Sequence, residues 1–195
     1  LPVQITEEQV KNIQQTMPEL PDVRRQRLQT EHQLSADDTR QIVQDRYTAD
    51  FIEQIIQQTN NVTAKKVVNF VLIDIAALLN LHHMKLADAP LTSHHCAQLL
   101  ARIADNTISN TGAKKVLQAL WQQADDVDTI IEQQGLKQIS DTGALAAIVA
   151  EVVQAHPQQA EQYRQGKSQL IGFFVGKVMQ QTQGKANPRQ VNELL

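Results

Sequence analysis

The sequence predicts an all-α protein, a multi-helix bundle domain followed by a small helical tail domain. Aromatic residues make up only 4% of the 195 residues, whereas alanine, glutamine and leucine are abundant. This composition favours helices over strands. Apolar residues also recur at i, i+3 and i+4 along most of the chain, which places them on one face of a helix.

The first three helices are predicted from the residues at their starts. Thr6, with Gln9 three residues later, matches a capping box, and Pro21 suits the first position of a helix. Ser35 is a favourable N-cap, and Asp38 lies near the positive end of the helix that follows. These residues begin helices that we expect over 6–17, 21–33 and 36–46.

Two more apolar helices follow, and we expect the second to be the central helix of the first domain. Residues 47–58 carry one apolar stripe, and residues 62–81 form the most apolar helix of the chain. The stripes consist of Phe51, Ile52, Ile55 and Ile56 in the first helix, and of Val67, Val68, Val71, Leu72, Ile75, Leu78 and Leu79 in the second.

Glycine and proline divide the remainder of the chain. Gly135 and Gly184 are placed to end helices, and Pro157 ends one helix and begins the next. Asn187 and Pro188 supply an N-cap and a first helical position for the last helix. The expected helices cover 96–105, 109–123, 125–134, 143–156, 157–165, about 167–182 and 187–195.

Composition and motifs argue against several classes of protein. No apolar run reaches the roughly 20 residues that a membrane span needs, and no signal peptide is visible. The single cysteine, Cys96, excludes an intrachain disulfide and is compatible with the cytoplasm, where we expect the protein. We find no nucleophile motif and no glycine-rich phosphate loop, and we assign no catalytic residue.

A group of histidines beside Cys96 raises the alternative of a transition-metal site. Adjacent histidines point in different directions on a helix, and no two histidines have the i, i+4 spacing of a helical metal site. We therefore favour surface histidines and a small buried cysteine, with no metal site. The residues concerned are His82, His83, His94, His95 and Cys96.

Charge is distributed unevenly, although the formal net charge is only −3. Residues 157–195 contain five lysines and arginines against two glutamates. Three of these cations, Lys177, Lys185 and Arg189, lie on the last long helix, at its end and on the final helix. The start of the final helix offers backbone N–H groups and partial positive charge. The tail is therefore predicted to meet an anion, although a solvated basic face explains the same residues.

Gly172 and Gly176 lie within the last long helix, four residues apart and therefore on one face. Each costs about 0.5–1 kcal/mol relative to alanine in a helix. We favour close packing of a neighbouring helix as the compensation. The alternative is a groove wall against which a nucleic-acid backbone lies.

Three stretches, taken in order, resemble one family. Residues 17–54 contain "MPELPDVRRQRL", "LSADD" and "ADFIE", which are similar to the segment after the catalytic core of GatB, the B subunit of aspartyl/glutamyl-tRNA amidotransferase. "PLTSHHCAQLLARIADNTIS" at 90–109 resembles another family segment. Residues 135–195 resemble the family's C-terminal domain, which stand-alone YqeY proteins share. "SNTGAKKV" at 109–116 departs from the family pattern and leaves the local helix start in doubt.

The resemblance implies a helical domain plus a YqeY-like tail, with the catalytic core preceding Leu1. We therefore divide the chain into a linker and first helix at 1–20, a helical domain at 21–125 and the tail at 126–195. In the parent enzyme the core activates Glu-tRNA(Gln) or Asp-tRNA(Asn) with ATP and Mg²⁺, GatA releases ammonia and GatC tethers the subunits. This region is then non-catalytic alone and needs no cofactor.

The resemblance also implies that the tail contacts tRNA, with the helical domain supporting the geometry of the acceptor side. From charge and placement, we select Lys167, Lys177, Lys185 and Arg189 as tRNA-binding residues, with Asn187 as a cap or a donor. Few aromatic residues are nearby to stack on bases, so we expect the tRNA to be recognised mainly by its backbone and its shape. The alternative is a module that docks other subunits or a synthetase.

Overall fold

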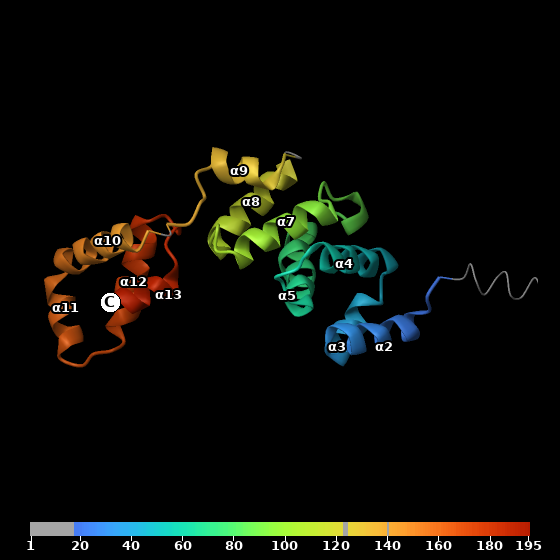
Figure 1. The fold of residues 1–195 in the computed structure, drawn as a ribbon, viewed down its shortest axis with the longest axis horizontal. Coiled ribbons are helices and arrows are strands. Elements are labelled where there is room, and N and C mark those ends of the chain that lie inside the picture. The colour runs from blue at the N-terminus through green and yellow to red at the C-terminus, as the bar shows by residue number, and fades with distance from the viewer. Residues whose placement is uncertain (1–17, 123–124, 140) are drawn as a thin grey trace, which may run out of the picture.

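The computed structural model describes residues 18–122, 125–139 and 141–195, and the described residues form an all-α fold, as predicted (Figure 1). The predicted helix over 6–17 lies outside the described residues. Within them, the only β pairing is an isolated antiparallel bridge between Ile108 and Lys137. No described helix is long and apolar enough to cross a membrane.

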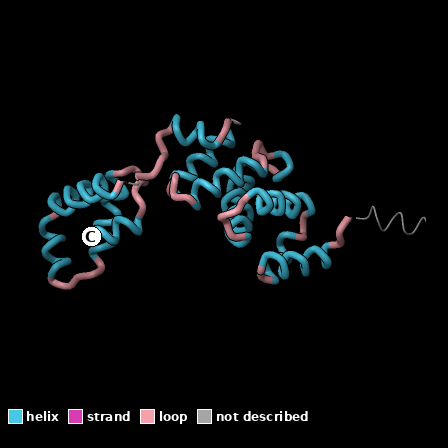
Figure 2. The backbone as a smooth tube through the Cα atoms, in the orientation of Figure 1, coloured by secondary structure: helices cyan, strands magenta, loops and turns pink. Residues whose placement is uncertain are grey.

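The helices fall into two groups along the chain (Figures 1 and 2). The first group consists of α2 (Pro21–His32), α3 (Ala36–Ile42), α4 (Arg46–Gln58), α5 (Ala64–Asn69), the π-helix η1 (Phe70–Ile75), α6 (Ala76–His82), the 3-10 turn η2 (Leu86–Asp88), α7 (Ser93–Ala104), α8 (Asn110–Gln122) and α9 (Val127–Gln133). The second group consists of α10 (Thr142–Ala155), α11 (Pro157–Arg164), α12 (Leu170–Gln181) and α13 (Pro188–Leu194).

Each group has its own hydrophobic core. The first core runs from Leu28 to Leu136 and includes the predicted stripes of α4 and of the α5–η1–α6 helix. The second runs from Leu145 to Val191 and is centred on Phe174 and Val178 of α12. We call the two groups the helical unit and the tail unit. Because the cores share no residue, the orientation of one unit on the other rests on other contacts.

Helix α9 belongs to the core of the helical unit. Val127, Ile130 and Ile131 are buried in the first core. The Arg102 guanidinium on α7 also holds the Asp128 carboxylate of α9 through two hydrogen bonds of 2.6 and 2.7 Å. Packing therefore places the division between the units after Leu136, whereas we expected it between residues 125 and 126.

Several predicted helix starts are confirmed by a proline in the first position or by a capping contact. Pro21 is the first residue of α2, the Ser35 hydroxyl accepts from the Asp38 N–H, and the Asn187 side chain accepts from the Arg189 N–H. At the doubtful start of α8, the Ser109 hydroxyl accepts from the Gly112 N–H at 3.1 Å. Helix α8 therefore begins as an ordinary capped helix, although the sequence at 109–116 departs from the family pattern.

The most apolar helix is continuous over 64–82, but its middle turn has π-helical hydrogen bonding from Phe70 to Ile75. A π segment widens the helix locally. Three members of the predicted stripe, Val67, Val68 and Ile75, are fully buried. On the opposite side, Ile73 and Leu81 are 62% and 69% exposed.

Candidate nucleic-acid interface

The candidate surface is built on α12, which the tail core holds by one face. Phe174 and Val178 are buried against the core. The apolar spacing of the helix therefore turns Gly172, Gly176 and Gln180 outward, where all three are exposed. Helix α12 offers a strip of nearly bare backbone to the outside.

The two glycines of this strip face open space. A Cβ atom built on either Gly172 or Gly176 would meet nothing within 4 Å. Our favoured interpretation, that these glycines let another helix of the chain pack closely, is therefore wrong for the described residues. No contact among the described residues compensates for the lower helix propensity of these two glycines.

Lys177 borders the strip and is held over an aromatic ring. Its Nζ lies 5.8 Å from the centre of the Phe173 ring, within the range of a cation–π interaction. The Phe173 ring in turn meets the His156 ring edge-on, with 5.2 Å between the ring centres. The ammonium group therefore lies over Phe173, on the residue that follows Gly176 in α12. Phe173 is a member of the surface that the charge pattern did not reveal.

Lys185, Asn187 and Arg189 are brought together at the other end of α12. Gly184, with a φ of +79°, reverses the chain after the helix, and the three residues follow within five positions. Asn187 acts as the N-cap of α13, which is the first of the two roles that we allowed for it. The capping contact uses its side-chain oxygen and the Arg189 N–H.

Lys185 also has a structural environment. Its Nζ lies 3.8 Å from the position that a Cβ on Gly135 would occupy, at the end of α9. A cation near the C-terminus of a helix is stabilised by the helix dipole. Lys185 is half-buried there, so it is more fixed than an ordinary surface lysine.

Lys167 stands apart from this group, because it precedes α12 whereas Lys185 follows it. A helix of 12 residues is about 18 Å long. The selected cations are therefore spread along α12 and do not converge on one pocket. Among the described residues, no carboxylate forms a salt bridge with any of the selected cations, Lys167, Lys177, Lys185 and Arg189.

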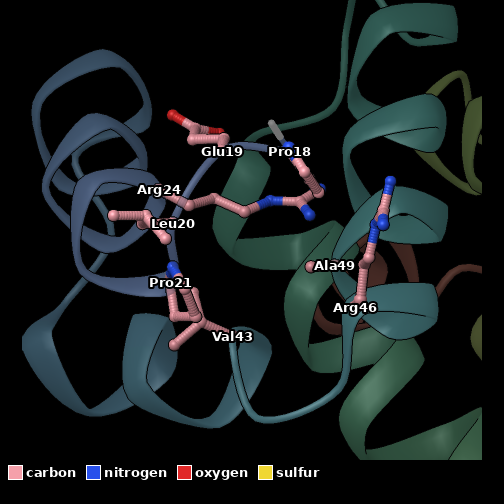
Figure 3. A pocket seen from close by; sticks show the side chains of 8 residues that line it. All are labelled: Pro18, Glu19, Leu20, Pro21, Arg24, Val43, Arg46 and Ala49. Atoms are coloured by element: carbon pink, nitrogen blue, oxygen red, sulfur yellow. The ribbon is translucent and has the colours of Figure 1, made fainter. Parts of the chain in front are cut away.

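A pocket lies elsewhere among the described residues, between α2 and the start of α4 (Figure 3). Its volume is about 350 Å³, and Arg24 and Arg46 line it from the two sides. Arg24 is engaged in ion pairs with Asp50 at 2.7 Å and Glu53 at 2.6 Å, which link α2 to α4. None of the selected cations lines this pocket.

The histidines considered as metal ligands have separate environments. The His82 ring stacks on Trp121 with 5.0 Å between centres, and His94 Nδ1 lies 3.3 Å from Gln58 Oε1. Cys96 is fully buried, and burial raises the pKa of its thiol to about 12. Among the described residues, no three histidine, cysteine or acidic side chains gather as a metal site.

Comparison with known proteins gives a family for this arrangement. Residues 50–195 match the model of the GatB domain, which includes all of the tail unit and most of the helical unit. The chain belongs to the GatB domain family. This GatB-family chain is 43% identical over its whole length to the B subunit of the aspartyl/glutamyl-tRNA(Asn/Gln) amidotransferase of Halorhodospira halophila.

Other relatives with the same name give similar values. The protein of Alkalilimnicola ehrlichii is 44% identical and that of Dichelobacter nodosus is 42% identical, each over 100% of this chain. The GatB-family chain spans about 40% of the length of the relatives that it matches.

Proposed function

We propose that this chain is a tRNA-binding accessory region of the B subunit of an aspartyl/glutamyl-tRNA(Asn/Gln) amidotransferase. In that enzyme, misacylated Glu-tRNA(Gln) or Asp-tRNA(Asn) is converted to Gln-tRNA(Gln) or Asn-tRNA(Asn). The region positions the tRNA by contacts to its backbone and shape. Membership of the GatB domain family and similarity to amidotransferase subunits along the whole chain support the proposal.

One structural observation supports tRNA contact most directly, namely the open strip of α12 bordered by unneutralised cations. Gly172 and Gly176 leave the helix backbone accessible, so that a ribose-phosphate backbone can approach closely. Lys177 at the edge of the strip, and Lys185 and Arg189 at its end, supply positive charge without carboxylate partners in the described chain. Phosphate contacts of this kind position a nucleic acid without reading its sequence.

The chemical step belongs to other parts of the parent enzyme in this proposal. The ATP- and Mg²⁺-dependent activating core lies outside this chain, and GatA and GatC are the other subunits. The described residues suit a supporting role, because the candidate surface consists of cations, glycines and an aromatic ring. Such residues bind and position a backbone by charge and close approach.

A second candidate function, protein docking, is favoured by exposed apolar residues of the helical unit. Ile73 and Leu81 lie eight residues apart on one helix, are 62% and 69% exposed, and have the exposed Ala77 between them. Such a stripe suits the apolar face of another subunit or of a synthetase. It lies on the helical unit, so it does not compete with the candidate surface on the tail.

Salt dependence separates the two functions. We would measure binding of Gln- and Asn-type tRNA to this chain from low to high salt, using the wild type and a Lys177→Glu/Lys185→Glu/Arg189→Glu variant. Each lost phosphate contact should reduce the slope of log K against log salt by about 0.7–0.9. Apolar docking should respond weakly to salt.

The matched control is Arg40→Glu/Lys66→Glu/Lys85→Glu, which makes the same change in net charge at exposed residues of the helical unit. Strong, salt-dependent binding by the wild type and the control, but not by the tail variant, supports the proposal. Equal binding by all three proteins would refute the assignment of the surface to the tail.

A further inference from the structure

Residues 137–139, which we call the connector because they lead from the helical unit to the tail unit, are paired on both sides. On one side, Lys137 forms the antiparallel bridge with Ile108, and the Gln138 N–H donates to the Thr107 carbonyl at 2.7 Å. On the other side, the Ile139 N–H donates to the Lys185 carbonyl at 2.9 Å. The connector therefore lies between the turn before α8 and the turn after α12.

Two side chains add direct links across this junction. The Ser109 hydroxyl donates to the Gly184 carbonyl at 2.7 Å while it caps α8. In the amide orientation that satisfies both neighbours, Gln138 donates to the Asn106 carbonyl at 2.9 Å and accepts from the Asn187 N–H at 3.1 Å. Each side chain thus joins a group of the helical unit to a group of the tail unit.

Gly184 brings the two units into contact at this point. A Cβ atom on Gly184 would lie 3.3 Å from the Thr111 Cγ2 atom, which is closer than ordinary van der Waals contact. The first turn of α8 therefore rests directly against the turn after α12. A glycine suits position 184 for two reasons, the close approach of the Thr111 side chain and the backbone φ of +79°.

We infer that Ser109 and Gln138 are positioning residues that hold the tail unit in one orientation on the helical unit. The two cores share no residue, so these polar contacts, with Gly184, carry much of the junction. Lys185, Asn187 and Arg189 follow Gly184 directly. Fixing this turn therefore fixes the cations that the proposed function assigns to tRNA, and the consequence for tRNA rests on that proposal.

Orientation can be measured without tRNA by pulsed electron spin resonance on the full chain. Spin labels at Gln118→Cys on α8 and Gln158→Cys on α11 report the distance between the units, and both positions are exposed. Cys96 is fully buried and stays unlabelled. We expect one narrow distance distribution for the protein with wild-type Ser109 and Gln138.

The test variant is Ser109→Asp/Gln138→Ala. An ionised aspartate keeps the cap of α8, because its carboxylate accepts from the Gly112 N–H, but it has no proton to donate to the Gly184 carbonyl. The double variant should lose the single narrow distribution. Ser109→Thr retains a donor and an acceptor, so it should behave as the wild type. An unchanged distribution in the double variant, or a broad one in the wild type, would overturn the inference.

Binding of tRNA tests the consequence for function. We expect the double variant to lose about fivefold in affinity, which corresponds to about one net hydrogen bond of orienting free energy. Asn110→Asp adds the same charge at the adjacent exposed position, and it controls for repulsion of phosphates. A broadened distance distribution with unchanged affinity would overturn the positioning role. Unchanged affinity in the tail charge variant as well would instead count against the proposed function.

Discussion

Replacing both Gly172 and Gly176 by alanine should stabilise the tail unit and weaken tRNA binding. An added Cβ meets no atom within 4 Å at either position, and neither glycine has a positive φ. Each substitution should therefore recover the helix propensity that glycine lacks, about 0.5–1 kcal/mol, which gives about 1–2 kcal/mol for the pair.

This stabilisation is large enough to measure by thermal or urea unfolding. For a unit of 60–100 residues, 1 kcal/mol shifts the melting temperature by about 4–8 °C, so the transition of the tail should rise by several degrees. Gly184→Ala is the opposite control, because its Cβ would lie 3.3 Å from Thr111 and its φ is +79°. That variant should melt at a lower temperature than the wild type.

The same double variant tests the function of the strip. If a ribose-phosphate backbone lies against Gly172 and Gly176, two methyl groups will hold it away and the affinity for tRNA should fall although the protein is more stable. Loss of stability in the variant would refute the structural reasoning about the exposed face. A gain of stability with unchanged affinity would refute the role of the glycines in tRNA binding.

Other predictions concern single residues. Asn187→Ala should destabilise the tail unit by about 1 kcal/mol in urea unfolding, because it removes the cap of α13. The Arg102 guanidinium lowers the pKa of Asp128 through hydrogen bonding. The ionised Asp128 therefore stabilises the fold at pH values above its unfolded-state pKa. This stabilisation is lost as the pH falls through the lower folded-state pKa. Asp128→Asn should remove this acid-dependent part of the unfolding free energy. Cys96 should resist alkylation at pH 8 in the native protein and react in urea, as followed by mass spectrometry.

Some helix starts were predictable from the residue at the start, an N-cap side chain or a proline in the first helical position. Ser35, Pro21 and Asn187 all begin helices at the expected positions. Helix α7 instead begins at Ser93, three residues earlier than we expected, because Thr92 caps it by accepting from the His95 N–H. We had assigned the neighbouring histidines to the loop, although their side chains leave a helix start unhindered.

The junction could not be predicted in the same way. Its backbone hydrogen bonds at Thr107, Gln138 and Lys185 impose no residue preference, so they leave no pattern in the sequence. The π-helical turn at 70–75 is similar, because the apolar spacing around it fits an ordinary helix equally well. The position of α9 rests on burial of its apolar residues in the first core and on the long-range pair between Arg102 and Asp128, and no local pattern indicates either contact.

The cations of the candidate surface were visible in the sequence, but their arrangement was not. Lys177 lies over the Phe173 ring, Lys185 lies near the end of α9, and Lys167 lies at the far end of α12. An extended row of this kind matches a polyanion better than a small anion, because the two ends of the row cannot contact the same phosphate. The spacing of about 18 Å along the helix is several times the separation of neighbouring phosphates, so only a long backbone engages the whole row.

The exposed glycines strengthen this argument, because stability alone would not retain them. Two alanines would fit the same space and favour the helix, so the present glycines lower the stability of α12 without a compensating contact among the described residues. An apolar protein partner gains little from bare backbone, since its affinity comes mainly from buried side chains. A nucleic-acid backbone gains close approach of its phosphates to Lys177. If Gly172, Gly176 and Lys177 bind one ligand, as we propose, their substitution should weaken binding of that same ligand.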